Sequence, residues 1–311
     1  MFPILAPLVV LVGPTAIGKT ALSIRLAQEF DFEIISIDSM QVYRYMDIGT
    51  AKISEGEMAG IPHHLIDVVN PDDPFDAGLF EKIALKAILD ISSRGKKVLL
   101  TGGTGLYLRA LLTGLSQNLP NFPDIRKEIQ EKLKKQGNDK LHDELSLYDR
   151  ISAQRIHKND THRLVRALEI YRGTGKTWSE FLQEHKENST IRFPHVLCLG
   201  LTCERKVLYQ RIEQRTRAML DSGLQREVLN LLERGYGKEL KAMQSIGYKH
   251  MIKHLQGEWD YQTMCQNLAR DTRRYAKRQY TWFNGIEGLL WFDKSTEQKV
   301  LSQVHEHLNK H

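Results

Sequence analysis

Cysteine is scarce in this sequence: Cys198, Cys203 and Cys265 are the only three among 311 residues. So small and odd a set offers neither a disulfide framework nor a C-x-x-C pair of metal ligands, which argues against a secreted scaffold and predicts a cytoplasmic protein. The sequence also lacks the ~18-residue apolar run that a membrane-spanning helix needs. Its apolar opening, residues 1–13, has no basic residue before it, unlike a signal peptide. We therefore expect no contact with a membrane.

Positive charge is not spread evenly along the chain. The net charge is +6 overall, but residues 1–120 carry net −3 and residues 201–284 carry net +7. Any phosphate affinity in the first segment must therefore come from local geometry. The later segment carries the excess expected of a protein that binds a long negative backbone, although a merely solvated basic face would look the same at this stage.

Strand and helix signals alternate through the first part of the chain. Hydrophobic residues make up 41% of the sequence and charged residues 26%, as in ordinary globular proteins, and the length suggests about two domains. Buried parallel strands are predicted where short apolar runs end at polar residues or glycine. These strands are expected at 8–12, 33–37, 97–101 and 195–201, with helices at 20–30, 80–93 and about 260–283.

The pattern changes in a stretch with two prolines and two asparagines, residues 118–124. From there to about residue 193 only helices are expected, one over 124–136 that stops at Gly137 and one from the N-cap Asp160 to Arg172 that is halted by Gly173. The chain is therefore predicted to consist of an α/β core, residues 1–118 and 195–311, with an all-helical insertion at 119–194. The core should be a parallel sheet flanked by helices.

A phosphate-binding pattern, G-x-x-x-x-G-K-[ST], lies between the first predicted strand and the helix after it. Its residues are Gly13, Pro14, Thr15, Ala16, Ile17, Gly18, Lys19 and Thr20. In this context the backbone N–H groups of the loop surround phosphate oxygens, Lys19 reaches the terminal phosphates and the Thr20 hydroxyl ligates Mg²⁺. The core is thus expected to be of the P-loop NTPase-like class. A diphosphate is the smallest ligand that the loop needs, and a nucleoside is not implied.

Two further polar residues follow predicted strands. Asp38 comes after the second strand, where open α/β sheets bind ligands, and could bind Mg²⁺ through water, accept a proton, or merely cap the next turn. Thr104 follows a glycine pair after the third strand and should lie on the same rim. The adjacent histidines His63 and His64 are expected to be structural rather than metal ligands.

A basic stripe is predicted on the long helix near the C-terminus. Five cations spaced i, i+3, i+4, i+7 and i+8 share one helical face, and aromatic residues alternate with them: Arg270, Arg273, Arg274, Lys277 and Arg278, with Tyr275, Tyr280, Trp282 and Phe283. Cations for phosphates and rings for unstacked bases suit single-stranded RNA. The alternative is a solvated face with the aromatic rings in the core. Weaker polar clusters lie at 154–158 and 244–249.

Together these segments resemble the bacterial tRNA dimethylallyltransferases, also called isopentenyl-pyrophosphate tRNA transferases. Eight motifs occur in the family's order over roughly residues 8–284. They are GPTAIGKT (13–20), DSMQVYR (38–44), DIGTAK (47–52), PHHLID (62–67), GGTGLYL (102–108), RIHKND with RALEIYRGTGK (155–176), MQSIGYK (243–249) and RRYAKRQYTWF (273–283). No cysteine follows Cys265, so the zinc finger of the eukaryotic relatives is absent from this sequence.

The resemblance implies transfer of a dimethylallyl group from dimethylallyl diphosphate to N6 of the adenosine 3′ of the anticodon. The P-loop would bind the donor's diphosphate, Lys19 and Thr20 with Mg²⁺ would steady it as it leaves, and Asp38 would be the general base. Arg211 and Arg215 resemble the arginines that neutralise the diphosphate. The partners implied are the tRNA anticodon stem-loop and dimethylallyl diphosphate, and a monomer is expected.

The resemblance also implies a set of tRNA-contacting positions. They are Asp38, Ser39, Met40, Gln41, Thr104, Arg126, Gln154, Arg155, Ile156, His157, Lys158, Gln244, Ser245, Ile246, Gly247, Tyr248, Lys249, Arg274, Lys277, Arg278, Gln279 and Trp282. The chain departs from the usual family pattern at Ile17 (Ser), Tyr45 (Gly), Lys158 (Pro), His250 (Glu) and Asn284 (Arg). None of these changes affects Lys19, Thr20 or Asp38.

Two alternatives stay open from the sequence. An adenylate prenyltransferase would share the P-loop and the donor but needs neither the basic stripe nor the helical insertion. A P-loop kinase or an RNA-binding NTPase would need only the loop, yet the sequence has no second strand ending in a clear Mg²⁺-binding aspartate besides Asp38 and no evident adenine pocket. We expect no useful rate of ATP hydrolysis.

Overall fold

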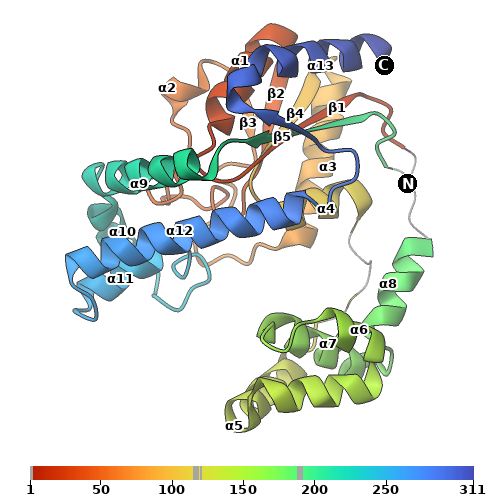
Figure 1. Cartoon of the computed structure of the whole chain (residues 1–311), viewed down its shortest axis with the longest axis vertical. Helices are drawn as coiled ribbons and strands as arrows, with labels where there is room; N and C mark the ends of the chain where they lie inside the picture. Colours follow the sequence, from red (N-terminus) through yellow and green to blue (C-terminus); the bar gives the residue numbers. More distant parts are fainter. Residues whose placement is uncertain (1–2, 115–118, 120, 188–191) are drawn as a thin grey trace. The chain divides into compact units, whose positions relative to one another are not determined.

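The structure is a computed structural model that describes residues 3–114, 119, 121–187 and 192–311 (Figure 1). The chain divides into two compact units, one of Met1–Leu112 with Ile191–His311 and one of Thr113–Thr190. Within the described ranges, no helix is long and apolar enough to cross a membrane.

The larger unit is built on a six-stranded sheet in which every pairing is parallel, in the order β3-β2-β4-β1-β5-β6. The strands are β1 (Leu8–Val12), β2 (Phe32–Ile37), β3 (His63–His64), β4 (Lys97–Gly102), β5 (Val196–Thr202) and β6 (Leu290–Asp293). The four expected strands and the α/β class are confirmed. Two further strands, β3 and β6, form the edges of the sheet. The sequence did not predict them, because two and four residues are too few to give a periodic signal.

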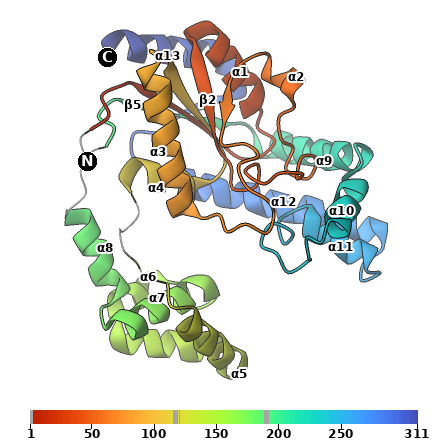
Figure 2. The same cartoon turned by 180° about the vertical axis from the view of Figure 1, so that it is seen from behind.

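Apolar side chains bury both faces of this sheet. Every residue of β1 is buried, as a central parallel strand requires. On one face, α1 (Lys19–Phe30) and α13 (Glu297–Lys310) join the core cluster through residues such as Leu26 and Val304. On the other face, α3 (Ala77–Ser93) packs against β2 and β4 (Figure 2), and α4 (Gly105–Thr113) follows β4. The carboxyl end of β1, where the phosphate loop begins, is therefore held in place by packing on both faces of the sheet.

The helices after β5 pack against one another beside the sheet. They are α9 (Arg205–Asp221), α10 (Leu224–Glu233), α11 (Tyr248–Leu255) and α12 (Tyr261–Phe283). Asp260 is the N-cap of α12, and its carboxylate accepts the Thr263 N–H at 2.6 Å. The helix packs against α9 and α11 (Figure 1). Two short helical segments, α2 (Glu55–Met58) and the 3₁₀ turn η1 (Lys294–Thr296), lie outside this group.

The smaller unit contains α5 (Pro123–Tyr148), α6 (Arg150–Arg155), α7 (Thr161–Thr174) and α8 (Trp178–Glu187) around its own apolar core. Gly137 has φ 79°, so α5 does break there as expected, but a helix resumes at once. The predicted stop at Gly173 is wrong: α7 continues to Thr174 and ends at Gly175, which has φ 73°. Gly173 is small for another reason, because a Cβ there would lie 2.2 Å from the Phe122 ring.

Candidate active site

Three strand ends meet at one edge of the sheet. Val12 of β1 and Ile37 of β2 both lie in register with Gly102 of β4, so the residues that follow them converge. Thr104 is tied to the residue after Asp38 there, because the Thr104 Oγ1 accepts the N–H of Ser39 at 3.0 Å. The expected convergence of the phosphate loop, Asp38 and Thr104 on one rim is confirmed.

The phosphate loop turns through residues in the left-handed region. Ala16 has φ 63° and Gly18 has φ 103°, and α1 starts directly afterwards at Lys19. The Lys19 ammonium donates to the carbonyls of Gly13 and Pro14, each at 2.9 Å. Burial, with a smaller contribution from Arg215, lowers the pKa of Lys19 to about 7, while Asp38 acts in the opposite direction. A buried ammonium with so low a pKa gains most when an anion arrives beside it.

The loop borders a cavity of about 470 Å³ that lies within the larger unit. Lys19, Thr20 and Asp38 line it, and so do Arg211 and Arg215. The two guanidinium groups are held by backbone carbonyls that they bond: Arg211 by that of Ile17 at 3.2 Å and Arg215 by that of Thr50 at 3.3 Å. The pKa of Arg215 is lowered, chiefly by burial. Cations on α9 thus face the phosphate loop across one cavity.

Another part of the lining is apolar. Ala51, Ile53, Ile66 and Ala218 contribute aliphatic surface, with Ile34 from β2. The sequence offered no signal for these residues, because they come from separate segments that only the fold brings together. The cavity therefore combines an anion-binding end with a wall suited to a hydrocarbon group.

Asp38 caps its own turn and also lies at the cavity. One carboxylate oxygen, Oδ1, accepts the N–H groups of Met40 at 2.9 Å and Gln41 at 3.4 Å, so the residue does cap its turn. It also lines the cavity. Tyr275 of α12 lines the same cavity, and its hydroxyl bonds the Thr104 side chain; burial is the main cause of the raised pKa of that phenol. Sequence reasoning had assigned Tyr275 only to the stripe.

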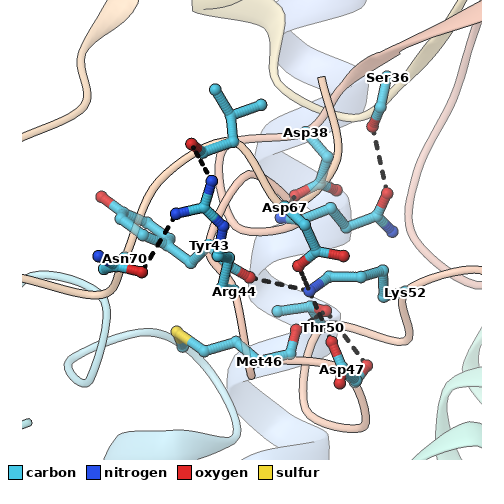
Figure 3. A network of polar contacts seen from close by, with 12 residues as sticks. Ser36, Asp38, Tyr43, Arg44, Met46, Asp47, Thr50, Lys52, Asp67 and Asn70 are labelled. Atoms are coloured by element: carbon cyan, nitrogen blue, oxygen red, sulfur yellow. Dashed lines mark hydrogen bonds and ion pairs between the residues drawn. The ribbon is translucent and has the colours of Figure 1, made fainter. Parts of the chain in front are cut away.

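A buried ammonium organises the segment after Asp38 (Figure 3). Lys52 Nζ donates to the Tyr43 carbonyl at 2.8 Å and to the carboxylates of Asp47 and Asp67, each at 2.6 Å, and its side chain is only 5% exposed. The Asp67 N–H in turn donates to the Gln41 carbonyl at 3.1 Å. The motifs at 38–44, 47–52 and 62–67 therefore have a structural reason, since they join one network beside the cavity.

The two adjacent histidines are held by local hydrogen bonds, and His63 also lines the cavity. His64 Nε2 lies 2.7 Å from Glu33 Oε2, and the same carboxylate accepts from Arg94. His63 bonds the Ile61 carbonyl at 2.8 Å. No group of three or more His, Cys, Asp or Glu side chains in the described ranges could hold a metal ion.

The basic stripe on α12 is narrower than predicted. Arg270, Arg274, Lys277 and Arg278 are exposed, but Arg273 is half-buried and paired with Glu213 of α9 at 2.9 Å. Only four of the five cations on the predicted stripe are therefore exposed, because α9 packs beside Arg273. The Trp282 ring packs against Gly105, where a Cβ would approach it to 1.9 Å.

Several positions expected to contact tRNA are buried in the protein. Tyr248 is fully buried, Ile156 is 2% exposed in the core of the smaller unit, and Gln279 is 5% exposed. Gly247 is buried as well. The other expected positions are more accessible. In the larger unit, Gln244 is exposed and six positions are half-buried: Ser39, Met40, Gln41, Ser245, Ile246 and Lys249. In the smaller unit, four positions are exposed: Gln154, Arg155, His157 and Lys158. Arg126 is ion-paired with the buried Glu169 at 2.7 Å.

Two departures from the family pattern have local explanations. Ile17 is fully buried in the core of the larger unit and does not line the cavity, so only its backbone belongs to the loop. Tyr45 has φ 67°, the left-handed region where glycine is favoured. The Arg234 guanidinium lies 4.2 Å from the centre of the Tyr45 ring, a cation–π contact that offsets part of that strain.

The fold and the site define a P-loop α/β protein whose cavity joins an anion-binding loop, arginines, a carboxylate and an apolar wall. Residues 41–285 match the family model described as IPP transferase. The chain is 51% identical over 298 residues to a tRNA dimethylallyltransferase of Desulfotalea psychrophila, covering 96% of this chain and 94% of that one. It is 46% identical to a tRNA dimethylallyltransferase of Clostridioides difficile, covering 94% of each.

Solved structures show the same relationship. A tRNA isopentenylpyrophosphate transferase of Bacillus halodurans has a TM-score of 0.72 at 39% identity and covers 98% of this chain and 97% of its own. A eukaryotic dimethylallyltransferase described as acting on tRNA has a TM-score of 0.82 at 30% identity and covers 98% and 80%. The chain belongs to the IPP transferase family, the tRNA dimethylallyltransferases.

Proposed function

We propose that this protein transfers the dimethylallyl group of dimethylallyl diphosphate to N6 of the adenosine 3′ of the anticodon in tRNA. The observation that carries the proposal is the single cavity in which Lys19, Arg211 and Arg215 lie with Asp38 and an aliphatic wall. Prenyl transfer needs these features together: a bound leaving group, an apolar site for the allyl chain and a proton acceptor. We infer that the enzyme works in the cytoplasm, where its tRNA substrate is found.

The phosphate loop and the cations would hold the diphosphate. Loop N–H groups and the N-terminus of α1 favour an anion, and Lys19 with the two arginines supplies three positive side chains around it. Negative charge grows on the diphosphate as the C1–O bond breaks, so these groups stabilise the transition state more than the ground state.

Mg²⁺ is part of the proposal through Thr20. This residue is in the first turn of α1 and lines the cavity, and its hydroxyl is an oxygen donor of the kind that Mg²⁺ accepts. A single protein ligand is sufficient when diphosphate oxygens and water complete the shell, in agreement with the lack of a carboxylate cluster in the described ranges. When bound, the ion would neutralise charge on the leaving group.

Asp38 is proposed as the general base. As the N6–C1 bond forms and the C1–O bond breaks, a proton must leave the adenine amino group, and a carboxylate at the rim can accept it. The Asp38 turn also fixes the orientation of that carboxylate, since Oδ1 is held by the N–H groups of Met40 and Gln41. The exposed cations of α12 and the exposed polar residues of the smaller unit are proposed to bind the tRNA backbone.

The decisive experiment measures transfer of radiolabelled dimethylallyl diphosphate to bulk bacterial tRNA, with AMP as a parallel acceptor. Asp38→Asn keeps the oxygen that accepts the Met40 N–H but loses basicity, and we expect kcat to fall about 10²–10⁴-fold with the donor KM nearly unchanged. Asp38→Ala removes the cap as well and should also impair binding. Label in AMP would favour the adenylate enzyme, and ATP turnover without transfer would favour an NTPase.

A further inference from the structure

One carboxylate outside the cavity gathers four hydrogen-bond donors. Glu227 in the first turn of α10 accepts the consecutive N–H groups of Asp47 (2.9 Å) and Ile48 (2.7 Å) on Oε2 and that of Gly49 (3.0 Å) on Oε1. Oε1 also accepts the Tyr248 hydroxyl at 2.6 Å. Successive N–H groups that converge on one point form a site for an anion, and here the protein supplies its own.

These bonds fix one wall of the cavity. The segment that Glu227 holds continues into Thr50, whose carbonyl accepts Arg215 at 3.3 Å, and into Ala51, which lines the cavity. Lys52 binds the side chain of Asp47 in the same segment (Figure 3). The position of a diphosphate-facing guanidinium therefore depends, through one backbone segment, on Glu227.

The fourth bond reaches the segment at 244–249. Tyr248 is the first residue of α11 and is fully buried, and its ring fills the space that a Cβ on Gly49 would occupy, 2.4 Å from Cε2. Gly247 has φ 100° and lies against Gly49, since a Cβ on Gly247 would be 3.5 Å from the Gly49 carbonyl oxygen. The segment at 47–51, which borders the donor site, and the segment at 244–249, proposed to contact tRNA, are thus packed together around the Glu227 carboxylate.

We infer that Glu227 is a positioning residue that holds Arg215 in the donor site and the 244–249 segment in a single arrangement; this rests on the proposed function. Each of the two Glu227 oxygens accepts two hydrogen bonds, and among side chains of this size only a carboxylate offers two such acceptors. A glutamine has the same shape, but its NH₂ group would face one of the two donor pairs, so Glu227→Gln disrupts the contacts without changing the size of the side chain. Glu227→Asp keeps the charge but is one methylene too short to reach all four donors.

The test compares Glu227→Gln, Glu227→Asp and Tyr248→Phe with wild type, and Glu233→Gln, exposed at the end of the same helix, is the matched control. KM for each substrate, kcat, the melting temperature and the Kd of inorganic diphosphate are measured. For Glu227→Gln we expect kcat/KM to fall about 10- to 100-fold, with KM raised for both donor and tRNA and diphosphate binding weakened about tenfold. Glu227→Asp should lie between, and Tyr248→Phe should raise KM for tRNA only.

A purely structural role would lower the folded fraction, and so kcat, with both KM values and the diphosphate Kd unchanged; that result for Glu227→Gln would overturn the inference. If Glu227→Gln does not fold, Glu227→Asp and Tyr248→Phe provide the test instead. Unchanged KM values in both of these variants would also overturn the inference. A wild-type protein that binds diphosphate but transfers no label would contradict the proposed function instead, and the diphosphate Kd of Glu227→Gln would still test the donor half of the inference.

Discussion

The amide of Gln279 joins the basic helix to the phosphate loop: its Oε1 accepts the N–H of Thr15 at 2.9 Å. The other half of the amide donates to the Gly103 carbonyl at 2.9 Å, so one side chain connects α12 to the loops after β1 and β4. A Cβ on Gly103 would approach the Gln279 Nε2 to 2.2 Å, which explains the glycine there. The helix that carries the exposed cations is thereby held in place over the cavity.

Gln279→Glu should impair donor binding. The new carboxylate still accepts from Thr15 but leaves the Gly103 carbonyl without its donor and places negative charge beside the diphosphate. An unsatisfied buried polar group costs about 1–3 kcal/mol, so we expect the donor KM to rise about 5- to 150-fold. Steady-state kinetics at varied donor would measure this, with Gln262→Glu, exposed on the same helix, as the control. Equal donor KM values in the two variants would refute it.

The low pKa of Lys19 predicts how donor capture depends on pH. The ammonium is charged below its pKa of about 7 and loses its charge above it, so kcat/KM for the donor should fall as the pH rises through 7. At saturating donor the bound diphosphate stabilises the charge, and kcat should change less. Lys19→Arg stays charged, so its kcat/KM should not show this fall, even if its absolute value is lower. The same fall in Lys19→Arg would assign the titration to another group.

Local patterns were enough to predict the phosphate loop, because its glycines, Lys19 and the flanking elements are consecutive in the chain. The helix of residues 261–283 was also predictable, but not which of its side chains face solvent. Periodicity places Arg273 on the basic stripe and the family resemblance places Gln279 among the tRNA contacts, whereas α9 supplies Glu213 for the first and the loops supply Thr15 and Gly103 for the second. Glu227 escaped a functional interpretation for the same reason, since its partner at 47–49 is about 180 residues away in the chain. Tyr248 was assigned to the tRNA surface, although the fold buries it against Gly49 and Glu227.

Glu33 should make the fold sensitive to acid. Mainly because Arg94 hydrogen-bonds it, with His64 adding to the effect, the pKa of this carboxyl is lowered from 4.5 to about 2. Because this pKa is lower in the folded protein than in the unfolded chain, the ionised Glu33 carboxylate stabilises the fold. Its contribution should be complete above about pH 5 and should be lost as the pH falls from 4.5 to 2. The free energy of unfolding in urea, measured against pH, should differ between wild type and Glu33→Gln, and the difference should shrink over that range. The control is Glu29→Gln, exposed on α1; a difference independent of pH would contradict the linkage.

Variants of the exposed cations of α12 can distinguish an RNA-binding surface from a merely solvated one. Lys277 is exposed on α12, and Lys299 is exposed on α13. If Lys277 contacts a phosphate, Lys277→Gln should raise KM for tRNA severalfold at low salt and reduce the slope of log KM against log salt by about 1. Lys299→Gln changes the net charge equally, and it should leave that slope unchanged if binding is local to α12. The donor KM should stay constant in both variants, because neither residue lines the cavity. Equal salt slopes for the two variants would mean that net charge alone attracts the tRNA, and the interpretation of α12 as a solvated face would then be correct.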